Sequence, residues 1–403
     1  MKVRTTIMTV KTIPLSLPDR ILAASRRPAT LGLVPAGAIS LAMGEPDGGS
    51  APDVVEAAVT ALRAGRTTYA PLTGLPELRE RLAARTEADS RRPTTANEIV
   101  LTHGASGALA ATILACLSAG DRVLLPEPTY SLYADQIAMV GAEAVGVPLR
   151  TDGTLDLDRL AELAPTARMI IVCNPANPTG HVLDADEVTG LAALLTVNPG
   201  LLLLSDEAYG SIVFDGVPFI SALTLHSVRD QVITVGTFSK SWSMTGWRLG
   251  WVVAEAATAA RIALVHRTVN GALNTFVQDA ALVALDTPAE SLAADAATYQ
   301  RRRDLVLSHL SDHEAITMNR PTGAFYAFPL VHGPLNSTEL VAAFADGGVL
   351  LRAGTEYGPS GEGHVRISFA TDDASLVEGL ARMRRVLDRI GRPSDHTDEG
   401  ATR

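Results

Sequence analysis

The chain has 403 residues, 47% hydrophobic and 19% charged, so it can bury a core large enough for one large and one smaller domain, and it lacks the composition of a disordered protein. Its formal charge of -10 argues against a surface for nucleic acid or for an anionic membrane, because both attract basic faces. Its two cysteines, Cys116 and Cys173, lie in apolar runs, which indicates buried thiols in a reducing cytoplasm rather than a disulfide framework.

Residues 1–50 are predicted to form an N-terminal arm, because prolines extend the chain between residues 13 and 18. The first 15 residues contain no apolar run long enough for a signal peptide, and no stretch approaches the length of a membrane span. We therefore expect a soluble cytoplasmic protein, with Met8 as a possible alternative start. Residues 44–47, Gly-Glu-Pro-Asp, end a short apolar run and taken alone are simply a turn.

Apolar residues at helical spacing predict a helix from Pro52 to Arg63. Tyr69 follows in a turn that leads into another amphipathic helix, and by itself it would be a packing aromatic. From residue 98 the pattern alternates between apolar runs and helices, which is typical of a parallel sheet with crossover helices. Strands are predicted at about 98–102, 122–125, 143–147, 169–173, 201–205, 232–236 and 249–253.

The carboxyl ends of such strands are where open sheets bind ligands, and the candidate site residues gather there. Residues 102–109 combine a strand end with small side chains, so a phosphate could approach the free N–H groups of a following helix. His103, which precedes this turn, is given no role. Tyr130 follows two prolines that fix its loop, and it could cover one face of a heteroaromatic ring.

Two further strand ends carry polar groups. Residues 173–180, Cys-Asn-Pro-Ala-Asn-Pro-Thr-Gly, contain two Asn-Pro units, which predict a rigid loop that presents amides. Asp206 ends a wholly apolar strand, where a carboxylate needs a partner such as a protonated pyridine nitrogen. A helix N-cap is the alternative interpretation of Asp206, although it leaves Tyr209, three residues later, unexplained.

Lysine is almost absent from this chain: Lys2, Lys11 and Lys240 are the three lysines among 34 basic residues. A lysine amine can lose its proton and attack carbonyls to form a Schiff base, whereas a guanidinium remains charged. The alternative explanation is that the composition of this chain simply favours arginine over lysine and that Lys240 has no special role. However, Thr237 and Ser239 place hydroxyls before Lys240, and Arg248 follows, a set that suits a phosphorylated aldehyde.

Beyond residue 254, alanine-rich helices are predicted to lead into a smaller domain. Residues 320–328 resemble an aromatic edge strand, and residues 363–370 resemble another strand that contains Arg366. Arg366 faces either solvent, as composition favours, or an acid. The polar tail from residue 391 is predicted to be disordered.

Several of these segments together resemble one family. Ser-Lys at 239–240 followed by Met-Thr-Gly-Trp-Arg-Leu-Gly-Trp at 244–251, together with Asn-Pro-x-Asn-Pro-Thr-Gly at 174–180, strongly resembles the class I aminotransferases, pyridoxal-phosphate enzymes of the aspartate and aromatic aminotransferase type. The resemblance covers residues 40 to 385. Glycines 48 and 49 replace the aromatic residue that usually follows the Gly-Glu-Pro-Asp segment in that family.

The resemblance implies a role for each matching residue. Lys240 would hold pyridoxal 5'-phosphate as an internal aldimine, Asp206 would pair with the pyridine nitrogen, and Tyr209 would donate to the phenolic oxygen. The remaining implied cofactor contacts are Ala105, Ser106, Tyr130, Asn177, Thr237, Ser239, Arg248 and, from a partner subunit, Tyr69. Arg366 would grip the substrate carboxylate, with Gly44 and Asn177 also at the substrate, and no metal is expected.

The implied fold is fold type I of these enzymes: an α/β large domain with a mostly parallel seven-stranded sheet flanked by helices, and a smaller α+β domain. The predicted division is an arm at 1–50 belonging to the small domain, a large domain at 51–288, a small domain at 289–390 and a tail at 391–403. The implied activity is transfer of an amino group from an L-amino acid to a 2-oxo acid by a homodimer with shared active sites. Another pyridoxal-phosphate reaction (C–S β-lyase, decarboxylase, racemase or oxidase) remains open, and a ligand-sensing regulator is a weaker alternative.

Overall fold

The computed structural model describes residues 16–26 and 36–390. The predictions for residues 1–15 and 391–403, including the alternative start at Met8 and the disordered tail, lie outside the described residues. In chain order, the α-helices and strands are α1 (Leu17–Ala24), β1 (Ile39–Ser40), α2 (Pro52–Arg63), α3 (Pro76–Ser90), β2 (Ile99–Thr102), α4 (Gly104–Cys116), β3 (Arg122–Glu127), α5 (Leu132–Val140), β4 (Glu143–Pro148), α6 (Leu157–Leu163), β5 (Met169–Cys173), α7 (Ala185–Val197), β6 (Leu202–Asp206), β7 (Val232–Thr237), α8 (Phe238–Ser241), β8 (Gly250–Val253), α9 (Ala256–Asn270), α10 (Thr275–Ala284), α11 (Ala289–Leu310), β9 (Ile316–Thr317), β10 (Tyr326–Ala327), β11 (Leu330–Val331), α12 (Ser337–Asp346), β12 (Val349–Leu350), β13 (Arg352–Ala353), β14 (Val365–Ser368) and α13 (Asp373–Ile390).

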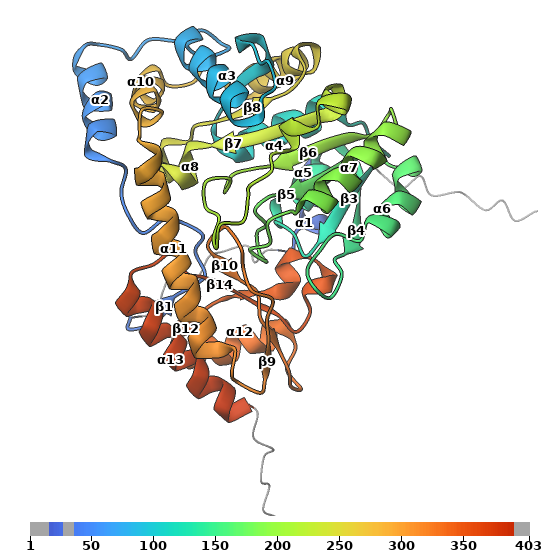
Figure 1. Ribbon diagram of the computed structural model, residues 1–403, viewed down its shortest axis with the longest axis vertical. Helices are drawn as coiled ribbons and strands as arrows, with labels where there is room; N and C mark the ends of the chain where they lie inside the picture. Colours follow the sequence, from blue (N-terminus) through green and yellow to red (C-terminus); the bar gives the residue numbers. More distant parts are fainter. Residues whose placement is uncertain (1–15, 27–35, 391–403) are drawn as a thin grey trace, which may run out of the picture.

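Seven strands form one sheet in the order β2-β8-β7-β6-β5-β3-β4 (Figure 1). Strand β8 runs antiparallel to both of its neighbours, β2 and β7, while the other pairs are parallel. The predicted α/β fold with a mostly parallel seven-stranded sheet is therefore confirmed, and each predicted strand lies within a residue or two of its expected range.

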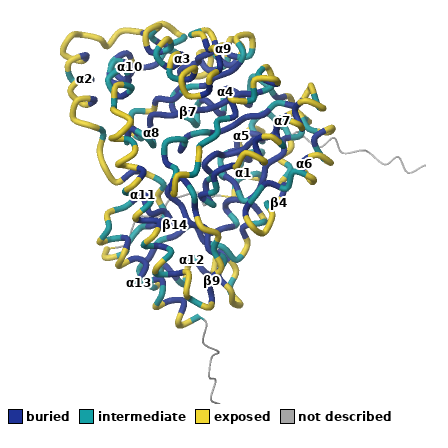
Figure 2. The backbone as a smooth tube through the Cα atoms, viewed as in Figure 1, coloured by how far each residue is buried: buried dark blue, intermediate teal, exposed yellow. Residues whose placement is uncertain are grey.

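The sheet is buried because helices cover both of its faces. Along β5, Ile171 packs into the core cluster that includes residues of α4 and α5, while Ile170 and Val172 pack with residues of α6 and α7 on the other face. Successive side chains of a strand point to opposite faces, so a strand covered on both sides must be apolar throughout. Figure 2 shows the buried backbone concentrated in these strands.

The chain beyond α10 builds the second, smaller α+β part, which lies below the large sheet in Figure 1. Strands β10, β14 and β13 form an antiparallel three-stranded sheet, and α11 packs against α13. The two predicted strands in this region are confirmed but are shorter than expected. Residues 322 and 323 donate their backbone N–H groups to the carbonyl of Gly180, and Gly323 forms an isolated antiparallel bridge with Val213. This stretch is therefore held by the loops that follow β5 and β6 rather than by a strand of the smaller sheet.

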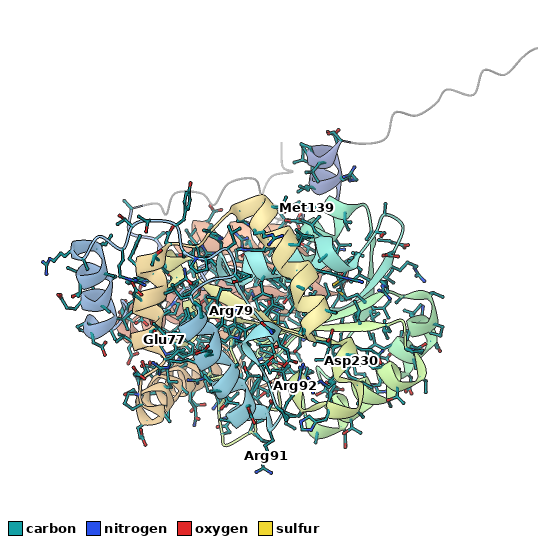
Figure 3. The ribbon with its side chains drawn as sticks, turned by 90° about the horizontal axis from the view of Figure 1, so that it is seen from above. Glu77, Arg79, Arg91, Arg92, Met139 and Asp230 are labelled. Atoms are coloured by element: carbon teal, nitrogen blue, oxygen red, sulfur yellow. The ribbon has the colours of Figure 1, made fainter. Side chains whose placement is uncertain are left out.

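The described residues before position 50 contact both parts of the molecule. Helix α1 packs against the end of α5, close to Met139 (Figure 3). There the Arg20 guanidinium donates to the carbonyls of Ala138 and Met139 at 3.1 and 3.0 Å. Strand β1 instead pairs with β12 of the smaller part. The predicted domain boundaries at residues 50, 288 and 390 remain predictions.

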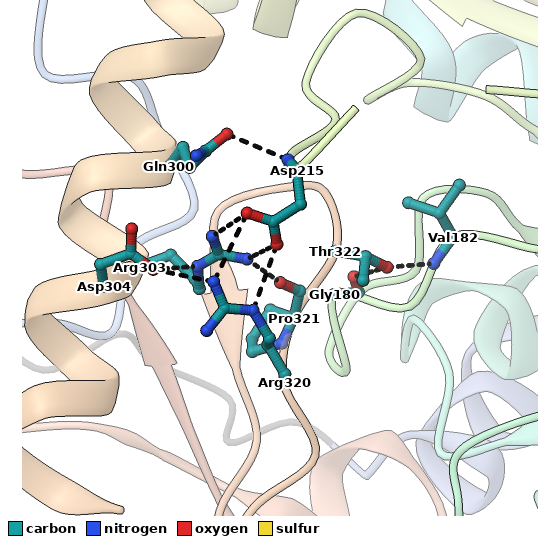
Figure 4. A network of polar contacts seen from close by, with 9 residues as sticks. All are labelled: Gly180, Val182, Asp215, Gln300, Arg303, Asp304, Arg320, Pro321 and Thr322. Atoms are coloured by element: carbon teal, nitrogen blue, oxygen red, sulfur yellow. Dashed lines mark hydrogen bonds and ion pairs between the residues drawn. The ribbon is translucent and has the colours of Figure 1, made fainter. Parts of the chain in front are cut away.

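A buried arginine connects the two parts. Arg303 on α11 is fully buried, and its guanidinium donates to both carboxylate oxygens of Asp215, at 2.8 and 2.9 Å, and to the carbonyl of Pro321 at 2.7 Å. The exposed Arg320 donates to the same carboxylate at 3.1 Å (Figure 4). This network ties the loop after β6 to α11 and to the turn before β10.

Replacing Asp215 by alanine is expected to lower the free energy of unfolding by about 2 kcal/mol. Removing one partner of a buried ion pair costs about 3–5 kcal/mol, and the loss should be smaller here because the Asp215 side chain is 32% exposed. Urea unfolding curves measure the change. The matched control is Arg320→Gln, whose side chain is 54% exposed and should contribute less than about 1 kcal/mol. Equal losses in the two variants would contradict this account.

Candidate active site

Lys240 lies on α8, the short helix that follows strand β7. Thr237 caps this helix, since its hydroxyl accepts the backbone N–H of Ser239 at 3.1 Å. The Lys240 amine donates to the backbone carbonyl of Gly44 at 2.7 Å. The Gly44 position has no room for a side chain, because an added Cβ would lie 1.9 Å from the Tyr326 hydroxyl. The turn at 44–47 thus lies against the lysine, 196 residues away in the sequence.

The surroundings of Lys240 favour the neutral amine. Burial lowers the pKa of Lys240 to about 8, with smaller contributions from nearby charges, including Glu45, which raises it, and Arg366, which lowers it. The rings of Tyr209 and Phe325, whose centres lie 5.9 and 5.7 Å from the amine, favour the charged form instead, but burial outweighs the opposing effects. A usable fraction of the side chain is therefore an uncharged nucleophile near neutral pH.

Asp206 lies at the carboxyl end of β6 and is 4% exposed. One carboxylate oxygen accepts the Tyr133 hydroxyl at 2.8 Å, and the other accepts the backbone N–H of Ala208 at 3.2 Å. Burial raises the pKa of Asp206 to about 6, whereas the Tyr133 hydrogen bond opposes this shift. Within residues 16–26 and 36–390, Asp206 forms no ion pair, so a bound cation at this position would be its natural partner.

A compact turn lies at the start of α4. Gly104 has φ +70°, and a Cβ there would lie 2.7 Å from a guanidinium nitrogen of Arg248. Gly250 is equally close to the backbone of this turn, with an added Cβ 3.0 Å from the nitrogen of Ala105. The absence of side chains lets Arg248 and the helix N-terminus approach each other, which concentrates positive charge where an anion such as phosphate binds.

Arg366 on β14 is 6% exposed, so the surface alternative is wrong. Its guanidinium lies over the rings of Tyr326 and Tyr357, at 4.4 and 5.2 Å from their centres. One terminal nitrogen donates to the side-chain oxygen of Asn177 at 3.1 Å, and the other donates to the carbonyl of Ala42. Its Nε is buried and has no hydrogen-bond partner among the described residues. Such a group is suited to a bound carboxylate.

These residues surround one cavity of about 300 Å³. Gly44 and eleven other residues that were predicted to contact cofactor or substrate line this cavity. The eleven are Ala105, Ser106, Tyr130, Asn177, Asp206, Tyr209, Thr237, Ser239, Lys240, Arg248 and Arg366. Tyr69 lies apart from the cavity and is 95% exposed. Its predicted role concerns a partner subunit and stays a prediction.

The structure also brings residues into the site that the sequence did not single out. Tyr133 reaches Asp206 from α5, and the Tyr326 hydroxyl lies 2.9 Å from that of Tyr209. Tyr357 and Arg352 complete the wall beside Arg366. The sequence offers one signal for Tyr326, which follows a Pro-Thr-Gly turn in a predicted strand. No local sequence pattern marks Tyr133, Tyr357 or Arg352.

His103 has a structural partner in the protein. Its backbone N–H donates to Nε2 of the buried His266 at 3.2 Å, and the two rings stack with their centres 5.2 Å apart. Burial lowers the pKa of His266 to about 4, which keeps the accepting nitrogen unprotonated. The contact fixes the backbone immediately before the α4 turn.

Other kinds of site receive no support in the described part of the chain. No cluster of histidine, cysteine, aspartate and glutamate with metal-binding geometry occurs in residues 16–26 and 36–390. No helix among the same residues is long and apolar enough to cross a membrane. Cys173 is buried as expected and Cys116 is partly buried, and both are free thiols.

The likeness to known proteins extends over most of the chain. The family described as aminotransferase class I and II matches residues 36–383. A probable aspartate/prephenate aminotransferase of Aquifex aeolicus is 33% identical over 87% of this chain and 91% of its own. An arginine–pyruvate transaminase of Pseudomonas aeruginosa is 35% identical over 87% and 88%.

Solved structures agree with this assignment. The aromatic aminotransferase of Pyrococcus horikoshii has a TM-score of 0.86 and 32% identity, covering 93% of this chain and 99% of its own. An aspartate aminotransferase of Thermus thermophilus has a TM-score of 0.84 and 30% identity over 93% and 100%. The chain therefore belongs to the class I and II aminotransferase family and is an enzyme, a transaminase with the fold of the aspartate aminotransferases.

Proposed function

We propose that this chain uses pyridoxal 5'-phosphate, the cofactor of its family, to move the amino group of an L-amino acid to a 2-oxo acid. The observation that carries the proposal is Lys240, a buried amine whose pKa is about 8 and which shares one cavity with Asp206 and Arg366. The residues present fit the cofactor, because the buried Asp206 lacks a cationic partner among the described residues and the α4 turn offers an anion site.

Bound pyridoxal phosphate would supply a carbonyl that exchanges amines and a ring that accepts electrons from the substrate α-carbon. Asp206 would keep the pyridine nitrogen protonated. The side-chain oxygen of Asn177 accepts from Arg366, which leaves its amide nitrogen to donate to the phenolic oxygen together with Tyr209. Tyr130 would cover one ring face.

The phosphate would lie at the α4 turn, held by the groups around it: Ala105, Ser106, Thr237, Ser239 and Arg248. Arg366 would bind the substrate α-carboxylate and so fix the α-carbon. The Lys240 amine would move the α-proton of the substrate as general base and general acid. Gly44 would position the lysine through its carbonyl.

We also propose a homodimer in the cytoplasm, with Tyr69 reaching the phosphate of the neighbouring subunit. Tyr69 is 95% exposed, and Leu62 and Leu72, which lie close to it in the sequence, are 44% and 51% exposed, so these side chains are accessible to a partner subunit. Light scattering of the cofactor-loaded protein measures the subunit number, and a monomer with full activity would refute this part.

The test of the proposed reaction is a half-reaction. The cofactor-loaded protein is mixed with single amino acids, and its absorption spectrum and the released 2-oxo acid are measured. Transamination predicts one equivalent of 2-oxo acid per site and recovery of the initial spectrum when a 2-oxo acid is added. Release of ammonia, sulfide or carbon dioxide, or racemisation, would instead indicate one of the other pyridoxal-phosphate reactions, for which the described site offers no specific support.

The pH dependence of cofactor uptake tests the state of Lys240. The cofactor-free protein is expected to capture pyridoxal phosphate about tenfold faster at pH 9 than at pH 7, with a midpoint near the lysine's pKa of about 8. The neutral amine is the reactive form, so the rate rises as pH passes this pKa and then levels off. Stopped-flow absorption measures it. A lysine with the ordinary pKa of about 10.4 would give roughly a hundredfold rise without a plateau in that range.

Replacing Arg366 by lysine is expected to lower kcat/KM for the amino donor by about 10- to 100-fold. Lysine keeps the charge but loses the planar fork, and a hydrogen bond to a charged group contributes about 1.5–3 kcal/mol. Steady-state kinetics with the best donor measure the loss. The comparison variant is Arg301→Lys, on the exposed side of α11, which should change kcat/KM less than about twofold. A change confined to kcat would argue against a role in carboxylate binding.

A further inference from the structure

A second arginine stands beside Arg366 in the cavity. Strands β13 and β14 pair with Arg352 directly opposite Arg366, and both residues line the cavity. Directly opposed residues of an antiparallel pair project from the same face, and two like charges there are destabilising unless one is compensated. The cavity therefore contains one guanidinium, that of Arg352, beyond the two that the proposed reaction uses, those of Arg248 and Arg366.

Glu356 compensates that second charge. The carboxylate of Glu356 lies 2.8 Å from a terminal nitrogen of Arg352, and the two side chains are only 9% and 15% exposed. The other oxygen of Glu356 accepts the backbone N–H of Ala353 at 3.2 Å, so the short turn at 354–357 holds the carboxylate in place. A buried ion pair of this kind is costly to break, because either partner alone would be an uncompensated buried charge.

The proposed reaction already assigns a role to each of the other cations that line the cavity. Lys240 is the nucleophile, Arg248 lies at the phosphate turn, and Arg366 takes the α-carboxylate. Beside Arg366, the wall contains the uncharged amide of Asn177 and is otherwise formed by Ala42, Met43, Tyr326 and Tyr357. In the described residues of this subunit, a second substrate carboxylate would have to displace Glu356 from Arg352 or remain unpaired in the cavity.

We propose that the site selects substrates with one carboxylate, and that Glu356 sets this selectivity by holding Arg352 in an ion pair. The amino acceptor is then a monocarboxylic 2-oxo acid, such as pyruvate, rather than a dicarboxylic one, such as 2-oxoglutarate or oxaloacetate. The donor is correspondingly an amino acid without a side-chain carboxylate. This inference depends on the proposed transamination and adds the substrate class to it.

Competition between acceptors tests the proposal. With the cofactor-loaded protein and its best donor, kcat/KM for pyruvate is expected to exceed that for 2-oxoglutarate by about 100-fold. Glu356→Gln should raise kcat/KM for 2-oxoglutarate about tenfold and leave that for pyruvate within about twofold. Glutamine keeps an oxygen for the N–H of Ala353 but frees the Arg352 cation. The double variant Glu356→Gln with Arg352→Met should lose the gain.

An inhibition measurement on the unaltered protein covers the case in which the variants do not fold. Succinate, which differs from butyrate by the second carboxylate, should inhibit about 100-fold more weakly than butyrate, and equal or stronger inhibition by succinate would overturn the proposal. Two further results would overturn the proposal. One is a wild-type preference for 2-oxoglutarate that Arg352→Met removes. The other is a folded Glu356→Gln protein with an unchanged ratio of kcat/KM between the two acceptors. If no 2-oxo acid accepts an amine from any donor, transamination itself fails, an outcome distinct from a changed ratio between acceptors.

Discussion

Replacing Lys240 by arginine is expected to lower kcat by at least about 10⁴-fold. Arginine keeps the positive charge and can still donate to the carbonyl of Gly44, but it is not a nucleophile and does not give up a proton. The variant therefore loses both the covalent anchor and the group that moves the α-proton, and general acid–base catalysis alone contributes about 10²- to 10⁴-fold. Single-turnover kinetics with the best donor measure the effect.

The other lysines of the chain supply the control for this substitution. Lys11→Arg makes the same chemical change at a position outside the described residues, and it should leave kcat within about twofold. A Lys240→Arg protein that folds, binds the cofactor and retains more than a hundredth of the wild-type kcat would rule out Lys240 as the proton-transfer group.

Replacing Asp206 by asparagine is expected to lower kcat by about 10²- to 10³-fold. Asparagine keeps the shape and an oxygen for the Tyr133 hydroxyl, but it has no charge to keep a pyridine nitrogen protonated. Loss of a buried charged partner costs about 3–5 kcal/mol, and the lost stabilisation should appear in the transition state, where the ring takes up electrons. Steady-state kinetics and the absorption spectrum of the loaded protein measure the loss.

Glu207 provides a control because it is the next residue and also carries a carboxylate, although its side chain is only half-buried. Its carboxylate accepts the Ser221 hydroxyl at 2.7 Å and the backbone N–H of Ala222 at 2.9 Å, away from the catalytic cavity, and burial raises its pKa to about 7. Glu207→Gln should therefore affect stability more than kcat, which should fall less than about fivefold. Similar losses of kcat in both variants would indicate a general structural effect instead of a specific role for Asp206.

The sequence predicted the sheet and most of the cavity for the same physical reason. Strands covered on both faces must be apolar throughout, so runs such as 169–173 stand out, and a polar residue at the end of such a run is conspicuous. Asp206 was found in this way, whereas the role of Asn177 came from the resemblance of its Asn-Pro loop to the family. The carboxyl ends of parallel strands meet at one edge, which explains why residues far apart in sequence line one cavity.

The remaining site residues depend on contacts that no local pattern encodes. Tyr133 and Asp206 are 73 residues apart, and nothing in the spacing of Tyr133 indicates which strand end it reaches. For Arg366, composition alone favoured the surface and only the resemblance to the family indicated a carboxylate-binding role, because its burial depends on Tyr326 and Tyr357, which approach it only in the folded smaller part. Arg352 is informative only once its pairing with Glu356 and its register opposite Arg366 are known.

The most direct test of the account is to identify the lysine that carries the cofactor. The protein is loaded with pyridoxal phosphate, reduced with borohydride, digested and examined by mass spectrometry. We expect one cofactor mass per chain, on the peptide that contains Lys240, and none on the peptides that contain Lys2 or Lys11. A loaded protein whose label lies on another residue, or that carries no label after reduction, would contradict it.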